Sequence, residues 1–121
     1  MAGETILHIG YDSVLLELRD SVLRRGDYQV ISSLGNASAR QAGQTVRADI
    51  AVIGSGGTYS ERLEMAVWLR KNLPGIPVIA MAVSPDEEFP DGVVLFYGRT
   101  PEDWLIAIER VLRGESQQSQ R

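Results

Sequence analysis

The segment Gly54-Ser55-Gly56-Gly57-Thr58 is the part of this chain whose residue types and spacing are best suited to hold a ligand. A glycine-rich loop before a helix can present backbone N–H groups to an anion, and the helix N-terminus favours negative charge. The loop has neither the nucleotide-phosphate nor the dinucleotide glycine spacing. Two interpretations therefore stay open: an anion-binding loop, or a flexible connection without a ligand.

Other residues capable of chemistry are few. His8 is the only histidine, and the sequence identifies no nucleophile or acidic partner for it, so we expect a structural role. The chain has no cysteine, which excludes disulfides and thiolate metal sites. No nucleophile–base pair, metal cluster or cofactor motif stands out. We therefore expect a noncatalytic protein that needs no cofactor or metal.

Length and charge narrow the function classes further. The 121 residues fit one domain with its own core. Twelve basic against sixteen acidic residues give a net charge of −4, which disfavours nucleic acid and anionic membranes as partners. No apolar run approaches the roughly 18 residues of a membrane helix, and the N-terminus lacks the basic start of a signal peptide. We expect a cytoplasmic protein.

The elements that position these residues follow an alternating pattern. Apolar runs of strand length alternate with stretches of helical period, which is typical of a parallel α/β sheet. Strands are expected at 5–9, 28–31, 49–53, 76–81 and 93–97. Helices are expected at 13–25, after Thr58 and after Thr100, with at best a short helix within 36–43.

Helix starts carry clear signals. Asp12 is suited to cap the first helix, and Thr58 with Glu61 forms a capping box for a later one. Thr100 followed by Pro101 marks the start of the last helix.

Helical period also predicts which side of the first helix is buried. The expected buried stripe consists of Leu15, Leu18 and Val22 with neighbouring Val14 and Leu23. Arg19, Arg24 and Arg25 are expected to face solvent, and Asp86-Glu87-Glu88 is interpreted as a solvated loop.

The arrangement resembles the receiver domain of bacterial response regulators. The resemblance spans roughly residues 4–114, and its best local matches are Leu73-Pro74-Gly75-Ile76-Pro77-Val78-Ile79, Pro101-Glu102-Asp103-Trp104-Leu105 and Asp49-Ile50-Ala51-Val52-Ile53. It implies a flavodoxin-like five-stranded parallel sheet in the order 2-1-3-4-5 with helices on both faces. Residues 1–114 would form the domain and 115–121 a flexible polar tail.

The residues that carry the chemistry of that family are altered here. The resemblance implies two acidic residues that hold magnesium, a phosphate-accepting aspartate, a hydroxyl residue and a lysine; by position these fall at Gly10 and Tyr11, Gly54, Ala82 and Tyr97. Magnesium needs hard oxygen ligands, and phosphoryl transfer needs its charge neutralised. Only Asp12 supplies a carboxylate nearby. The sequence therefore predicts that conventional aspartyl phosphorylation is lost.

The connection between the last two expected strands is also short. Only 11 residues, Ala82 to Gly92, separate these strands, and two of them are proline. A parallel crossover needs about a dozen residues or more. We therefore expect the family's fourth helix to be shortened or absent.

These observations favour a noncatalytic signal-transduction module of a two-component or phosphorelay system that acts through protein–protein interaction. Its output would pass through a protein partner of the pathway, because only seven residues follow Gly114. Tyr97, Trp104 and Phe89 are candidate interaction residues, and a homodimer is a further possibility. The alternative is a small-ligand or anion sensor that binds at the Gly54–Thr58 loop.

Overall fold

A five-stranded parallel sheet forms the centre of the molecule in the computed structural model, which describes residues 3–97 and 100–114. The strand order is β2-β1-β3-β4-β5, which confirms the predicted topology. The strands are β1 (Thr5–Gly10), β2 (Gln29–Leu34), β3 (Ile50–Ile53), β4 (Val78–Met81) and β5 (Val93–Phe96). The helices are α1 (Ser13–Arg25), α2 (Asn36–Thr45), α3 (Tyr59–Asn72) and α4 (Pro101–Leu112).

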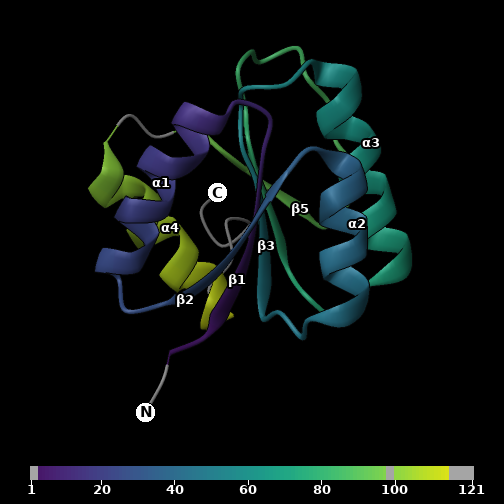
Figure 1. Ribbon diagram of the computed structural model, residues 1–121. Helices are drawn as coiled ribbons and strands as arrows, with labels where there is room; N and C mark the ends of the chain where they lie inside the picture. Colours follow the sequence, from purple (N-terminus) through teal and green to yellow (C-terminus); the bar gives the residue numbers. More distant parts are fainter. Residues whose placement is uncertain (1–2, 98–99, 115–121) are drawn as a thin grey trace.

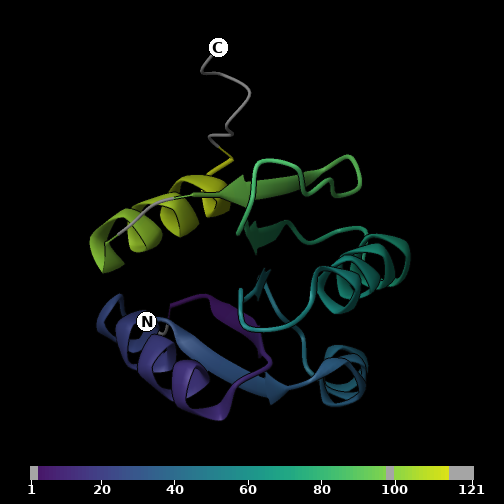
Figure 2. The ribbon, with the colours of Figure 1, turned by 90° about the horizontal axis from the view of Figure 1, so that it is seen from above.

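The helices cover the sheet in two layers. Helices α1 and α4 lie against one face, and α2 and α3 lie against the other (Figures 1 and 2). Successive side chains of β1 point to opposite faces of the sheet and contribute to both cores. Leu7 and Ile9 belong to the core under α2 and α3, whereas Ile6 belongs to the core under α1 and α4. Each such fully buried aliphatic side chain contributes about 1.5–3 kcal/mol to folding.

The predicted helix caps are present. The Asp12 carboxylate accepts the N–H groups of Val14 and Leu15 at the start of α1. Thr58 and Glu61 form the complete capping box of α3. The Thr100 hydroxyl accepts the Asp103 N–H, with Pro101 as the first residue of α4.

The buried face of α1 differs from the prediction. Leu23 is fully buried, but Val14 and Leu18 are 64% and 60% exposed. The side turned towards the sheet instead runs through Leu16, Asp20 and Leu23, and Leu15, Arg19 and Val22 are half-buried beside it. Apolar residues occupy both sides of this helix, so the sequence pattern did not determine which side packs inward.

Two connections complete the architecture. Helix α2 is longer than the short helix expected, because its alanines at 37, 39 and 42 favour a helix and Ala39 packs into the core. The segment 82–92 is described throughout and contains no helix, which confirms that the fourth helix of the resembled family is absent. Among the described residues, no helix is long and apolar enough to cross a membrane.

Candidate functional site

The positions that match the family's phosphorylation pocket lie along the carboxyl edge of the sheet. Gly10 ends β1 and Tyr11 follows it, while Gly54, Ala82 and Tyr97 come directly after β3, β4 and β5. Parallel strands in register bring these ends to one edge, which is where doubly wound sheets hold their ligands. The backbone therefore provides the place for a site, and the side chains decide its chemistry.

Gly54 is closely surrounded by backbone. Its N–H donates to the Ile9 carbonyl at 2.8 Å. A Cβ atom added at Gly54 would lie 3.2 Å from that carbonyl oxygen and 3.6 Å from Nη1 of Arg19. The first of these distances is shorter than ordinary van der Waals contact, so the neighbouring backbone would have to move. The position therefore lacks the carboxylate for an acyl phosphate, and a side chain there would require the Ile9 carbonyl to shift by a few tenths of an ångström.

The carboxylate of Asp12 is used to cap a helix. Its Oδ1 accepts the N–H of Val14 at 2.9 Å and the N–H of Leu15 at 3.1 Å. Within residues 3–97 and 100–114, no group of three or more histidine or acidic side chains is placed to hold a metal ion. Magnesium prefers several oxygen ligands in octahedral geometry. The described residues therefore offer no acidic cluster of the kind that would hold it.

Arg19 reaches from α1 to the edge of the sheet beside Gly54. Its Nη1 donates to Oγ of Ser55 at 3.2 Å. The side chain is half-buried, and burial lowers the pKa of Arg19 from its usual value. The prediction that Arg19 faces solvent is wrong. The spacing with Leu15 and Val22 was the available signal, because a residue four after one inward position and three before another shares their face.

Tyr11 fills the space on the opposite side of the loop. A Cβ at Gly57 would lie within 3 Å of the Tyr11 ring, so the two residues are in close contact. The Tyr11 hydroxyl donates to Oδ1 of Asn36 at 2.7 Å. Burial, with the nearby Glu61 carboxylate as a second cause, raises the pKa of Tyr11. Tyr11 therefore fastens the β1–α1 connection to the start of α2.

Tyr97 has a different environment. Its side chain is 56% exposed, and it lines a groove of about 480 Å³ along β5 and α4. The α4 side of this groove contains the exposed Ile106, between Asp103 and Arg110. Tyr11 and Tyr97 therefore have different surroundings, although both follow strand ends at the same edge.

Two of the candidate interaction residues are not exposed anchors. Trp104 is only 3% exposed and packs against the sheet with the α1 and α4 core. Phe89 is partly buried against the other core, with its ring 5.8 Å from the Tyr59 ring in a T-shaped arrangement. The sheet and α3 offer these large rings apolar surface to cover, so both present little surface to a partner, and their role as interaction residues stays a prediction.

The N-terminus of α3, at the end of the Gly54–Thr58 loop, is already occupied by its own side chain. The Glu61 carboxylate accepts the Thr58 N–H at 2.9 Å, and the Thr58 hydroxyl accepts the Glu61 N–H at 3.0 Å. The carboxylate satisfies a donor that an anion would use and places a negative charge at the same end. Anion binding at this end of the loop is therefore disfavoured, while Ser55 and Arg19 remain at the other end.

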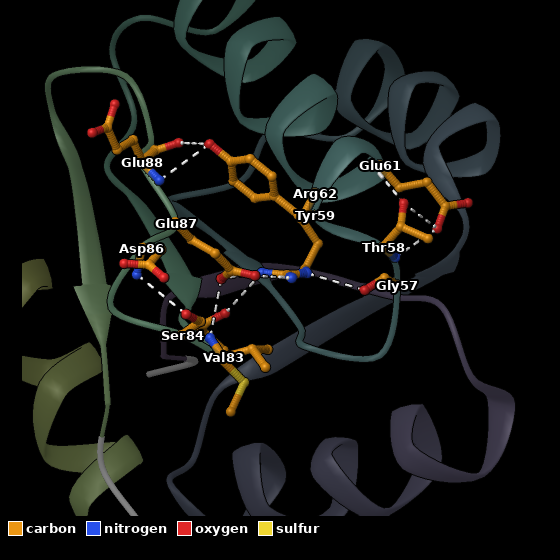
Figure 3. A network of polar contacts seen from close by, with 11 residues as sticks. Gly57, Thr58, Tyr59, Glu61, Arg62, Val83, Ser84, Asp86, Glu87 and Glu88 are labelled. Atoms are coloured by element: carbon orange, nitrogen blue, oxygen red, sulfur yellow. Dashed lines mark hydrogen bonds and ion pairs between the residues drawn. The ribbon is translucent and has the colours of Figure 1, made fainter.

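The β4–β5 connection, residues 82–92, is held against α3 by an ion pair (Figure 3). Arg62 binds Glu87 through both guanidinium N–H arms, and the side chains are 3% and 10% exposed. Glu87 also accepts the Val83 N–H at 3.1 Å, and Nε of Arg62 donates to the Gly57 carbonyl at 3.2 Å. The hydrogen bonds from Arg62 lower the pKa of Glu87 to about 2.

A second contact fastens the same connection. The Tyr59 hydroxyl donates to the Glu88 carbonyl and accepts the Glu88 N–H at 3.1 Å (Figure 3). The interpretation of the acidic run as a solvated loop is therefore wrong for Glu87. Its partner, Arg62, lies 25 residues earlier in the chain, so no local pattern indicated the pair.

His8 has an acidic partner that the sequence did not reveal. Its Nδ1 lies 2.7 Å from Oδ1 of Asp20, and the Ser32 hydroxyl donates to the other oxygen of Asp20. Burial alone would raise the pKa of Asp20, but the hydrogen bonds from His8 and Ser32 outweigh it and lower the pKa. His8 and Asp20 are 1% and 5% exposed and Ser32 is exposed, so the group joins β1 and α1 in the core to β2 at the surface.

Comparison with known proteins shows which solved structures have a similar fold. No protein-family model matches the sequence, and no curated protein is similar to it in sequence. A CheY-like response regulator receiver domain from Methanospirillum hungatei has a similar structure, with a TM-score of 0.77, 18% identity, and 93% of this chain and 95% of that chain covered.

Two further solved structures have a similar fold. The signal receiver domain of an HD domain-containing protein from Pseudomonas fluorescens has a TM-score of 0.78 at 15% identity, covering 93% of this chain and 96% of that one. A chemotaxis response regulator of Vibrio cholerae has a TM-score of 0.74 at 16% identity, covering 89% and 98%. Identities this low establish the receiver fold and not a shared activity.

Proposed function

We propose that this chain is a noncatalytic signalling module that uses the receiver fold for protein–protein interaction and is not phosphorylated on aspartate. The observation that carries the proposal is the glycine at position 54, directly after β3, because a glycine has no carboxylate to accept a phosphoryl group. The diversion of Asp12 to the α1 cap supports it, because the metal-binding charge is then missing as well.

The test combines a phosphoryl donor with magnesium. The full chain is incubated with magnesium and acetyl phosphate, or with beryllofluoride, and followed by intact mass and by NMR. We expect no added phosphoryl group and no magnesium-dependent shift of the amides around Gly54. A stoichiometric acyl phosphate, or broad shifts of those amides, would contradict the proposal.

The partner surface is proposed to be the groove beside Tyr97. Tyr97 and Ile106 leave apolar surface exposed there, and Asp103 and Arg110 offer a charge of each sign beside it. An exposed aromatic ring with a polar tip is a frequent anchor of protein interfaces. The proposed partner is a protein of the same signalling pathway.

The surface is tested by quantitative capture from the native host. Wild type, Tyr97→Ala and the matched control Val67→Ala serve as baits; Val67 is exposed on α3, on the other face of the sheet. We expect a partner that wild type and Val67→Ala retain and Tyr97→Ala loses. Equal retention by all three baits would remove the groove from the proposal. Self-association through the groove stays a prediction, which analytical ultracentrifugation of wild type and Tyr97→Ala tests.

An anion sensor at the Gly54–Thr58 loop is the second candidate function. The observation that favours it is the hydrogen bond between Arg19 and Ser55, which places a cation at the start of the loop. A thermal-shift screen of nucleotides, flavins and inorganic phosphate separates the two functions. Stabilisation that Ser55→Ala and Arg19→Met abolish would favour the sensor, and its absence at millimolar ligand would leave the interaction module.

A further inference from the structure

The outer edge of β5 has no partner strand among the described residues. β5 is the last strand of the sheet and pairs with β4 alone (Figure 2). The Phe96 carbonyl accepts the Ala82 N–H at 3.0 Å, so the backbone groups of Phe96 point towards β4. Because backbone groups alternate between the two edges of a strand, the N–H and carbonyl of Leu95 point away from β4. In the part of the chain that the structure describes, no hydrogen bond reaches them across this outer edge.

The residue types of β5 leave this edge open to another strand. Proteins commonly protect an edge strand with charged residues or proline, because its unpaired backbone groups can pair with another chain. β5 consists of the apolar residues Val93–Phe96 and contains neither. The strand at the opposite edge, β2, contains the polar residues Gln29, Ser32 and Ser33. An extended segment would therefore find both backbone partners and apolar surface at β5.

Helix α4 forms a wall beside the same edge. The groove of about 480 Å³ is lined by residues 94–97 of the strand side and by Asp103, Ile106, Ala107 and Arg110 of the helix. The spacing of the four α4 residues places them on one face of the helix. At roughly 3.3 Å per strand residue and 1.5 Å per helix residue, the two walls both extend for about 10 Å. The groove therefore has the length of a short extended segment.

The α4 wall carries opposite charges at its two ends. α4 starts at the edge of the sheet where β5 ends and runs back beside it (Figure 1), so Asp103 lies at the Tyr97 end and Arg110 at the other end. No ion pair between described residues uses either side chain. Ile106 is exposed between them, next to Ala107. A complementary segment therefore has a basic, an apolar and an acidic side chain in this order along the wall.

We propose that the groove binds an extended peptide segment of a partner protein, which pairs antiparallel with the outer edge of β5. The N–H and carbonyl of Leu95 bond to the backbone of the segment. The basic side chain of the segment contacts Asp103, and its acidic side chain contacts Arg110. The apolar side chain between them covers Ile106 and Ala107. Antiparallel pairing is slightly more stable per residue than parallel pairing, so the basic residue comes first in the segment. This inference rests on the proposed function, because it specifies the kind of partner that the groove takes.

A blocked pentapeptide is the probe. Acetyl-Lys-Thr-Val-Thr-Glu-amide places its lysine, valine and glutamate on one face of a strand. Added to the ¹⁵N-labelled full chain, it is expected to shift the amides of residues 94–97 saturably, to slow hydrogen exchange of the Leu95 amide, and to leave the amides of β2 unchanged. The peptide of reversed sequence has the same composition but brings like charges together. It is expected to bind at least roughly fivefold more weakly.

Methylation of the peptide backbone tests the strand pairing itself. Successive N–H groups of a strand point to opposite edges, and N-methylation removes one of them. Of two peptides, one methylated at the valine and one at the following threonine, we expect only one to lose affinity, by at least roughly tenfold.

A pair of arginine variants tests the charge. Arg110→Met is expected to weaken binding of the original peptide roughly threefold. Arg25→Met, which changes an exposed arginine of α1, is expected to leave it unchanged. Thermal unfolding establishes that both variants are folded.

Four results would overturn the proposal: no saturable shift at millimolar peptide, equal affinity of the two methylated peptides, equal affinity of the original and reversed peptides, or equal affinity of wild type and Arg110→Met. Protection of the Leu95 amide that rises with protein concentration in the absence of peptide would also overturn it, since a second copy of the chain would then occupy the edge. Capture of a Tyr97-dependent host partner alongside any of these results would keep the interaction function and remove only the extended peptide. An acyl phosphate would instead contradict the proposed function and leave the peptide result standing.

Discussion

Replacement of Glu87 by glutamine tests the ion pair that fastens the β4–β5 connection to α3. Glutamine keeps the shape of the side chain and an acceptor for the Val83 N–H, but it removes the negative charge opposite Arg62. Hydrogen bonds to charged groups contribute about 1.5–3 kcal/mol each when a partner is lost. With the pair only slightly exposed, we expect Glu87→Gln to lower the free energy of unfolding by about 2 kcal/mol, which corresponds to roughly 8 °C in Tm.

The pH dependence gives the same prediction a second readout. The pKa of Glu87 falls from its ordinary value of 4.5 to about 2 in the folded state. A carboxyl group whose folded pKa is lowered stabilises the fold above its unfolded pKa and loses this contribution as the pH falls through the folded pKa. The stability difference between wild type and Glu87→Gln should therefore be full near neutral pH and shrink between about pH 4.5 and 2.

Chemical denaturation at several pH values measures both effects, with Glu88→Gln as the matched control. Glu88 is the exposed neighbour, and its recorded contacts with Tyr59 use its backbone. Arg62→Met and the double variant complete a cycle, in which we expect a coupling energy of about 1–2 kcal/mol. If Glu87→Gln is as stable as Glu88→Gln near neutral pH, or if their difference is the same at low pH, the ion pair does not hold the connection.

Three further changes test other parts of the site. Gly54→Asp is expected to gain no phosphoryl group from acetyl phosphate and magnesium by intact mass, because Asp12 caps α1 and the described residues form no acidic cluster to hold magnesium; phosphorylation of this variant would show that the missing carboxylate was the sole obstacle. Asp20→Asn is expected to lower the free energy of unfolding by about 1–3 kcal/mol in urea, since it removes the charge that His8 and Ser32 contact; unchanged stability would mean that the buried group contributes nothing. Tyr11→Phe is expected to cost about 0.5–1.5 kcal/mol and the exposed control Tyr97→Phe almost nothing; equal effects would contradict the assigned role of the Tyr11 hydroxyl.

The fold was accessible from the sequence because its signals are local. Strand-length apolar runs alternate with helical stretches, and caps such as Asp12 and Thr58 depend only on residues two or three positions away. The short 82–92 connection predicted the missing helix from its length alone. The five altered pocket positions could be placed for the same reason, since each directly ends or follows a strand.

The side-chain partnerships were not accessible, because each joins distant parts of the chain. Arg19 lies 36 residues before Ser55, and Arg62 lies 25 residues before Glu87. A single sequence contains no signal for such pairs. The buried face of α1 could not be predicted for a related reason. Apolar residues lie on both sides of this helix, so the sequence allowed two buried faces, and tertiary packing selected the one that contains Arg19.

The network of contacts at the carboxyl edge bears on how such a module would act. Tyr11 binds the start of α2, Arg19 binds the loop after β3, and Arg62 holds the β4–β5 connection to α3. Each contact joins a different pair of elements, so a rearrangement of this edge would have to break several partly buried polar interactions together. A partner that meets a surface already held in place loses less conformational entropy on binding. Within the proposed function, the arrangement therefore favours recognition of one preformed state over a change of shape driven by phosphate.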